Sequence, residues 1–229
     1  PDSGEEYQAR IDATDTEIRQ FLVDEEIITI PDYINELATN VPWIVRESGP
    51  NFWEQIQYRN PTPDHLHAVI PGHRFDAVVE RNNPHPVRGR LTDGARVEGW
   101  GVYLEEAMMY AGLLDEKPRV RELIYLFGIF RAARMPADVW LQLNIMTADD
   151  VADFWIEHVP YLDRDVARVD AEIYLRRPPG YGLGYTTGML QMQALLAARQ
   201  RQLGDMFDLR QFHDALMAAG RLPLALIHW

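Results

Sequence analysis

Two histidines and one glutamate have the residue types and the order of a metal site. His67 and His73 share the segment His67-Ala68-Val69-Ile70-Pro71-Gly72-His73, and Glu98 begins the segment Glu98-Gly99-Trp100 further along the chain. Zn2+ and non-haem iron both bind two imidazoles and one carboxylate, and both keep open positions for water or substrate. His67, His73 and Glu98 are therefore predicted to be metal ligands, for Zn2+ first and Fe2+ as the alternative. Taken singly, each could equally be a core or surface residue.

The general base of a metallopeptidase is missing from its usual place. Such an enzyme carries a glutamate directly after the first histidine, and this position is Ala68 here. Glu105 and His213 are the candidate substitutes. By helix geometry Glu105 lies about 10 Å beyond Glu98 along the same helix, so it cannot bind the same ion. Two interpretations of Glu105 therefore remain: it contacts the metal ligands or the substrate, or it is an ordinary surface charge.

Two tyrosines in a glycine-rich stretch are candidates for stabilising an oxyanion. Tyr181 and Tyr185 follow Pro179-Gly180, and their hydroxyl groups could donate hydrogen bonds to negative charge that develops in a transition state. Packing of both rings on the core is the open alternative. The stretch lacks the lysine and serine of a phosphate-binding loop, so it does not indicate a nucleotide site.

The elements that carry the histidines must be interrupted if both are to reach one ion. Six helical steps of about 100° would place His67 and His73 about 120° apart around a regular helix. Proline removes a backbone donor and clashes with the preceding turn, so Pro71-Gly72 predicts a break or a kink between them.

The remaining pattern predicts a mainly α protein with at most a short strand or two. Residues 1–60 are interpreted as a lead-in helix (5–24), a short strand (27–30) and a connecting segment, and residues 61–229 as a helical metal-binding domain of catalytic type. Within the second part, apolar spacing and capping residues predict helices at about 96–113, from 119 into the low 140s, after Thr147, at 161–176, at 185–203 and after Asp208, with a loop over 177–184.

Composition excludes several classes of protein. The net charge of −13 argues against a nucleic-acid partner, and the absence of cysteine excludes disulfides and thiolate metal sites. No apolar run is long enough to span a membrane. The chain begins with Pro1, so a signal peptide could have been removed, and both a cytoplasmic and a secreted location stay open.

Five ordered motifs resemble the C-terminal half of the bacterial family called domain of unknown function 885, whose relatives are gluzincin-like metallopeptidases. The matching residues are His67, Pro71, Gly72 and His73; Glu98, Gly99, Trp100, Tyr103, Glu105 and Glu106; Arg131, Ala132, Arg134 and Asp138; Pro179, Gly180 and Tyr185; and Phe207, Asp208, Phe212, His213, Asp214, Leu216, Gly220, Pro223, Leu224 and Ile227.

The resemblance implies a helical gluzincin-like fold and metal-dependent hydrolysis of a peptide or small amide. It also shows departures: Ala68 replaces the catalytic glutamate, and Gln142 stands where the family has a histidine. Family members are about twice as long, so a helical N-terminal half is expected to be missing or to belong to a partner chain. A non-haem iron enzyme and a catalytically inactive binding or scaffold homologue are the alternative functions.

Overall fold

The structure is a computed structural model that describes residues 1–34, 37–40, 43, 47 and 49–227. The predicted connecting segment before residue 60 therefore lies partly outside the described residues. Ten α-helices and three short 3-10 helices are present in the described part, which confirms the prediction of a mainly α fold. They are α1 (Gly4–Asp24), η1 (Asp32–Ile34), α2 (Phe52–Arg59), α3 (Thr62–Ala68), α4 (His73–Arg81), α5 (Gly94–Ala111), α6 (Pro118–Gln142), α7 (Ala148–His158), α8 (Arg164–Arg176), α9 (Tyr181–Leu203), η2 (Gly204–Met206), α10 (Leu209–Ala219) and η3 (Leu224–Leu226).

The strand predicted over residues 27–30 is wrong. Ile27 and Ile28 are buried in the core, and the backbone is paired with side chains of α10 instead of with another strand. The Thr29 N–H and hydroxyl donate to the Asp214 carboxylate at 2.9 and 2.6 Å, and the Ile27 carbonyl accepts from His213 at 2.7 Å. The β-branched run therefore indicates burial and not a strand, because a strand also needs a neighbouring strand as its hydrogen-bond partner.

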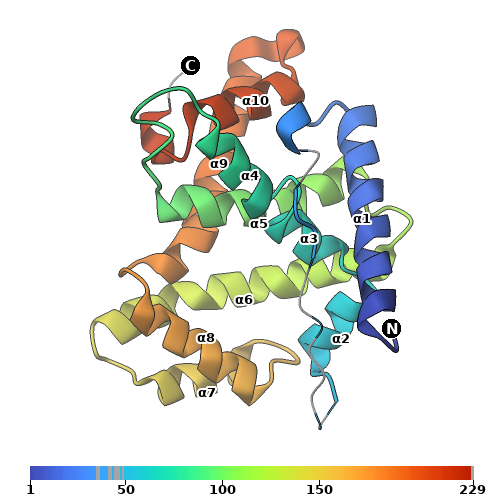
Figure 1. Ribbon diagram of the computed structural model, residues 1–229. Helices are drawn as coiled ribbons and strands as arrows, with labels where there is room; N and C mark the ends of the chain where they lie inside the picture. The colour runs from blue at the N-terminus through green and yellow to red at the C-terminus, as the bar shows by residue number, and fades with distance from the viewer. Residues whose placement is uncertain (35–36, 41–42, 44–46, 48, 228–229) are drawn as a thin grey trace.

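The long helix α6 separates two hydrophobic cores. In Figure 1, α7 and α8 lie on one side of α6, and α3, α4, α5 and α10 lie on the other. The smaller core surrounds Trp155 of α7, and the larger one surrounds Trp100 of α5. Ile18, Leu22 and Ile34 from the start of the chain also belong to the larger core. No helix in the described part of the chain is long and apolar enough to cross a membrane.

Glycines allow α5 and α9 to cross at very short range. A Cβ atom on Gly99 would lie 2.3 Å from the Gly188 carbonyl carbon, and one on Gly188 would lie 1.9 Å from the Ala95 oxygen. Both distances are far below any real contact. The crossing therefore needs glycine on both helices, and it brings the start of α9 beside Glu98 of α5.

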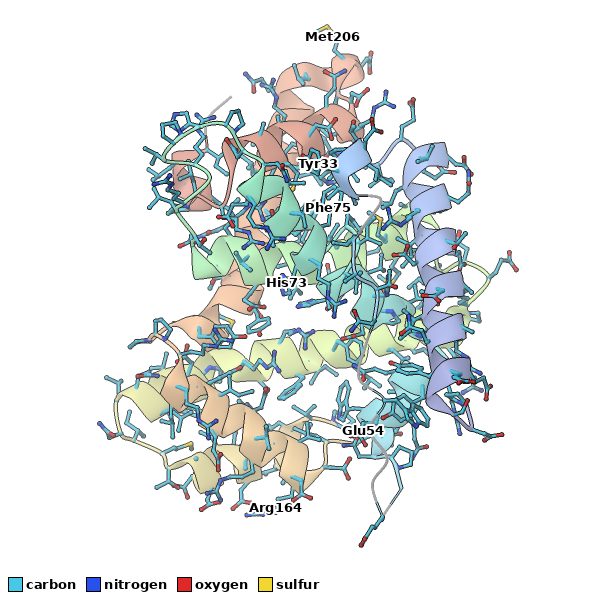
Figure 2. The ribbon with its side chains drawn as sticks, viewed as in Figure 1. Tyr33, Glu54, His73, Phe75, Arg164 and Met206 are labelled. Atoms are coloured by element: carbon cyan, nitrogen blue, oxygen red, sulfur yellow. The ribbon has the colours of Figure 1, made fainter. Side chains whose placement is uncertain are left out.

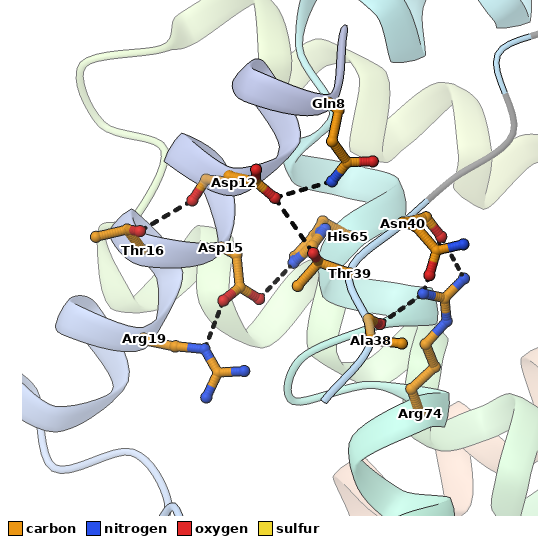
Figure 3. A network of polar contacts seen from close by, with 10 residues as sticks. All are labelled: Gln8, Asp12, Asp15, Thr16, Arg19, Ala38, Thr39, Asn40, His65 and Arg74. Carbon is orange, nitrogen blue, oxygen red and sulfur yellow. Dashed lines mark hydrogen bonds and ion pairs between the residues drawn. The ribbon is translucent and has the colours of Figure 1, made fainter. Parts of the chain in front are cut away.

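A buried hydrogen bond fixes the rotation of α3 on the side away from the candidate ligands. Nε2 of His65 lies 2.8 Å from Oδ1 of Asp15 on α1, and the second carboxylate oxygen of Asp15 accepts from Arg19 at 2.5 Å (Figure 3). His65 and His67 are two residues apart, so their side chains project about 200° apart around α3. With His65 held by α1, His67 points to the opposite side of the helix, towards α5.

The loop predicted over residues 177–184 is wrong after Gly180. The helix α9 already begins at Tyr181, because Oδ2 of Asp138 accepts the free backbone N–H groups of Gly182 and Leu183 at 2.8 and 3.2 Å. Free N–H groups at a helix start need such an acceptor. Gly180 precedes the helix with a φ of 92°, which only glycine adopts readily.

Candidate metal centre

The chain breaks between the two histidines, as Pro71-Gly72 predicts. His67 lies in the last turn of α3, and His73 is the first residue of α4. Between the helices the backbone folds back so closely that a Cβ atom on Gly72 would lie 2.0 Å from the His67 carbonyl oxygen. The tight turn brings the two imidazole rings to a centroid distance of 4.6 Å, in an edge-to-face arrangement.

The structure brings His67, His73 and Glu98 together at one point. One ligand atom from each residue lies within 4.8 Å of the other two. Oε2 of Glu98 lies 3.4 Å from Nε2 of His73 and 3.8 Å from Nε2 of His67. Ligand atoms on a tetrahedral zinc, at bond lengths of about 2.1 Å, are separated by about 3.4 Å. The spacing therefore fits a zinc-sized ion, and Figure 2 shows His73 between the ribbons of α5 and α6.

A buried carboxylate orients the ring of His67. Oε1 of Glu105 lies 2.6 Å from Nδ1 of His67 and also accepts from Arg131 at 3.1 Å. Glu105 is only 1% exposed, so the surface-charge interpretation is excluded. In the neutral form of the ring, Nδ1 carries the proton and donates it to Glu105, so the lone pair of Nε2 lies on the side of Glu98. Carboxylates hold metal-binding histidines in this way in many metal sites.

The pKa values of the groups in the cluster depend on their charged neighbours, because the groups are buried away from water. Burial opposes ionisation of Glu98, yet His67 and His73 hold the pKa of Glu98 well below its usual range. Burial likewise opposes protonation of His67, but hydrogen bonding to Glu105 raises the pKa of His67. Oε2 of Glu98 and Nδ1 of His73 are buried without a hydrogen-bond partner. An unsatisfied buried carboxylate oxygen is costly, and a bound cation would satisfy it.

Tyr185 and Tyr181 lie beside the cluster on the first turns of α9. The Tyr185 ring stacks on the His67 ring at a centroid distance of 6.4 Å, and the two tyrosine hydroxyl groups are 2.7 Å apart. Burial raises the pKa of both tyrosines, and the negative charge of Glu98 contributes to both shifts. Both hydroxyl groups are therefore neutral at physiological pH, and one of them donates its proton to the other.

The side chain of His213 is already committed elsewhere. Its Nδ1–H donates to the Ile27 carbonyl, and its Nε2 accepts from the Tyr103 hydroxyl, each at 2.7 Å. The ring is fully buried and packs against Trp100. With both nitrogens occupied, His213 has no free lone pair with which to take a proton from water.

Sequence reasoning assigned no role to three residues of α6 that support the cluster. Arg131 bonds Glu105 and lies 5.4 Å over the Tyr185 ring, while Arg134 lies 4.6 Å over the same ring and pairs with Asp170 at 2.5 Å. Asp138 holds the start of α9. The spacing of Arg131, Arg134 and Asp138 places all three on one helix face. This spacing could have been used to predict from the sequence that they act at one site.

Two solved structures resemble this chain in fold. A putative lipoprotein from Colwellia psychrerythraea aligns with a TM-score of 0.72 and 20% identity, over 95% of this chain and 41% of that one. A putative lipoprotein of unknown function from Shewanella oneidensis aligns with a TM-score of 0.71 and 19% identity, over 96% of this chain and 45% of that one. The chain thus spans less than half the length of either structure.

No curated protein sequence matches this chain. The family described as bacterial protein of unknown function (DUF885) matches residues 55–228, which begin in α2 and include all three candidate ligands. Because this match covers most of the chain, the protein belongs to the DUF885 family of bacterial proteins.

Proposed function

We propose that this protein is a zinc-dependent hydrolase of peptide or small amide bonds, related to the gluzincins, with His67, His73 and Glu98 as ligands. The observation that carries the proposal is the buried carboxylate oxygen of Glu98, which faces two imidazole nitrogens at 3.4 and 3.8 Å. These distances exceed those of good hydrogen bonds and fit ligands spaced around an ion. The Glu105 contact, which leaves Nε2 of His67 free, supports it independently.

Each residue around the cluster has a task in this reaction. A zinc ion held by His67, His73 and Glu98 would polarise the substrate carbonyl and lower the pKa of a bound water. Glu105 fixes the tautomer and the orientation of His67, and Arg131 fixes Glu105. One of the neutral hydroxyl groups of Tyr181 and Tyr185 donates to the other, and the O–H that remains free stabilises the oxyanion by donating a hydrogen bond to it.

None of the three candidate positions for a general base is free to act as one. Ala68 cannot accept a proton, Glu105 is occupied by His67 and Arg131, and His213 is occupied by Tyr103 and Ile27. A general base contributes about 10²–10⁴ in rate, so we expect hydrolysis by this sequence to be slower by about that factor. The same observation favours two alternatives: a non-haem iron enzyme, which needs no such base, and an inactive scaffold protein.

The metal content of protein purified from its native host tests the proposal. We expect about one zinc per chain, lost in the His73→Ala variant, whereas iron would favour the oxygenase alternative. A chain that contains no metal and takes up none at micromolar zinc would overturn the proposal. A panel of short peptides and small amides, assayed with and without a chelator, then tests hydrolysis.

A further inference from the structure

A cavity of about 460 Å³ lies between the last two turns of α5 and the middle of α9. Its size is that of sites for small organic ligands. Apolar atoms form most of its wall, to which Phe207, just after η2, and Leu209, the first residue of α10, also contribute. The residues that matter for its chemistry are Tyr103, Glu106, Tyr110, Gln193, Leu196 and Phe207.

Glu106 carries the one carboxylate among the described residues that line this cavity, and none of the described cations pairs with it. Oε2 of Glu106 accepts a hydrogen bond from the Gln193 side chain at 2.9 Å, and within the described residues Glu106 has no ion pair. None of the described residues that line the cavity is lysine, arginine or histidine. Burial raises the pKa of Glu106, and its negative neighbour Glu105 adds to the shift. A half-buried carboxylate without a counter-ion is an electrostatic cost that a cationic ligand would remove.

Aromatic rings complete a surface suited to a cation with an apolar body. Tyr110 is 69% exposed, so its ring is accessible from solvent, while Tyr103 is buried deeper and donates its hydroxyl to His213. Phe207 adds a third ring. The faces of aromatic rings attract ammonium groups, and a carboxylate among rings is an arrangement suited to organic amines. The net charge of −13 also favours the approach of cations.

We propose that this cavity is a binding site for a small organic cation, an ammonium group on an apolar body, with Glu106 bonding the charge and Tyr110 and Phe207 covering the apolar part. The site is separate from the metal centre. Glu105 and Glu106 are neighbours on α5, and successive residues project about 100° apart around a helix. Glu105 turns to His67, and Glu106 turns to Gln193 of α9. The proposal therefore does not depend on the metal or on hydrolysis.

Three probes with one carbon skeleton and different charges test this site. Binding of 2-phenylethylammonium, 2-phenylethanol and phenylacetate is measured by calorimetry at neutral pH, on the full chain with zinc and after treatment with a chelator. We expect the ammonium ion to bind at least tenfold more tightly than the neutral alcohol, as a hydrogen bond to a charged group implies. Phenylacetate should not bind at this cavity, and removal of metal should leave the ammonium affinity unchanged.

Matched variants locate the binding. Glu106→Gln keeps the side-chain size and should lower the affinity for the ammonium ion about tenfold, to that of the alcohol. Glu157→Gln on the exposed face of α7 removes the same charge and should leave the affinity unchanged. Tyr110→Ala, at an exposed position that tolerates truncation, should weaken binding several-fold. Equal affinities of the ammonium ion and the alcohol, or an ammonium affinity that Glu106→Gln leaves unchanged, would overturn the proposal.

Discussion

Oε1 of Glu105 lies 2.6 Å from Nδ1 of His67, on the side of the ring opposite the nitrogen that faces Glu98. This contact decides which imidazole nitrogen carries the proton, and therefore which one can bind a metal. Arg131 holds the same carboxylate oxygen, so the orientation of His67 is determined by α5 and α6 together.

Substitution of Glu105 should weaken zinc binding without removing a ligand. Glu105→Gln deletes the charge but keeps the size, and partners of this kind change metal affinity by about 10–100-fold. We expect a loss in that range when zinc affinity is measured by competition with a chromophoric chelator. His73→Ala, which removes a proposed ligand, should lose more. Glu157→Gln serves as the charge-matched control, and a zinc affinity of Glu105→Gln equal to that of the control would contradict the proposed role.

The missing base can be restored at position 68. Ala68 directly follows His67 in α3 and is only partly buried, so a longer side chain there has room towards solvent. Ala68→Glu should raise the hydrolysis of short peptides by about two or more orders of magnitude, the usual contribution of a general base.

Ala68→Gln is the control for this gain, because it matches glutamate in size but does not take up a proton. Rates for both variants are compared over a peptide panel at equal zinc occupancy. Equal rates for Ala68→Glu and Ala68→Gln would reject the interpretation as a peptidase that lacks its base.

Gly101 should be needed for the position of the His67 ring. A Cβ atom on Gly101 would lie 2.7 Å from Cε1 and Nδ1 of His67, so Gly101→Ala must displace the imidazole. We expect lower zinc affinity and a lower melting temperature. Gly128→Ala in α6 is the matched control, since its Cβ would meet no atom within 4 Å. That change should stabilise the fold by about 0.5–1 kcal/mol through helix propensity. A Gly101→Ala protein that binds zinc normally would show that the ring has room to move.

Stability should fall in acid because His213 is buried as the neutral ring. Burial lowers the pKa of His213 from 6.5 to about 4. Between these values the unfolded chain binds more protons than the folded one, so stability decreases as the pH falls from 6.5 towards 4. The loss is at most about 1.4 kcal/mol per pH unit. Urea unfolding at a series of pH values, in the presence of a chelator, measures this slope.

His213→Gln removes the titrating group and should flatten the slope in that interval, although the variant is less stable at neutral pH. An unchanged slope in His213→Gln would assign the acid sensitivity to other groups. Asp15 is one such group, because its bonds to His65 and Arg19 lower its pKa in spite of its burial. Its stabilising contribution is lost at lower pH, as the pH falls through the folded-state pKa of Asp15.

Local patterns in the sequence were sufficient to predict the helical class and most helix limits. Apolar spacing and end signals such as Thr147, Asp208 and Gly220 act within a few residues, so they can be interpreted without knowledge of the fold. The interruption between His67 and His73 is local in the same sense, because Pro71 prevents a regular helix whatever surrounds it. The three candidate ligands could be named for this reason.

Contacts between distant segments decided the rest. The run at Ile27 pairs with α10 and not with a strand, and α9 begins at Tyr181 because Asp138, 43 positions earlier, accepts its free N–H groups. Glu105 could have been a surface charge by its position on α5. Its role follows from the packing of α3 and α6 against that helix, which removes water and leaves His67 and Arg131 as its partners. Such contacts join residues far apart in the chain, so they cannot be predicted from the spacing of neighbouring residues.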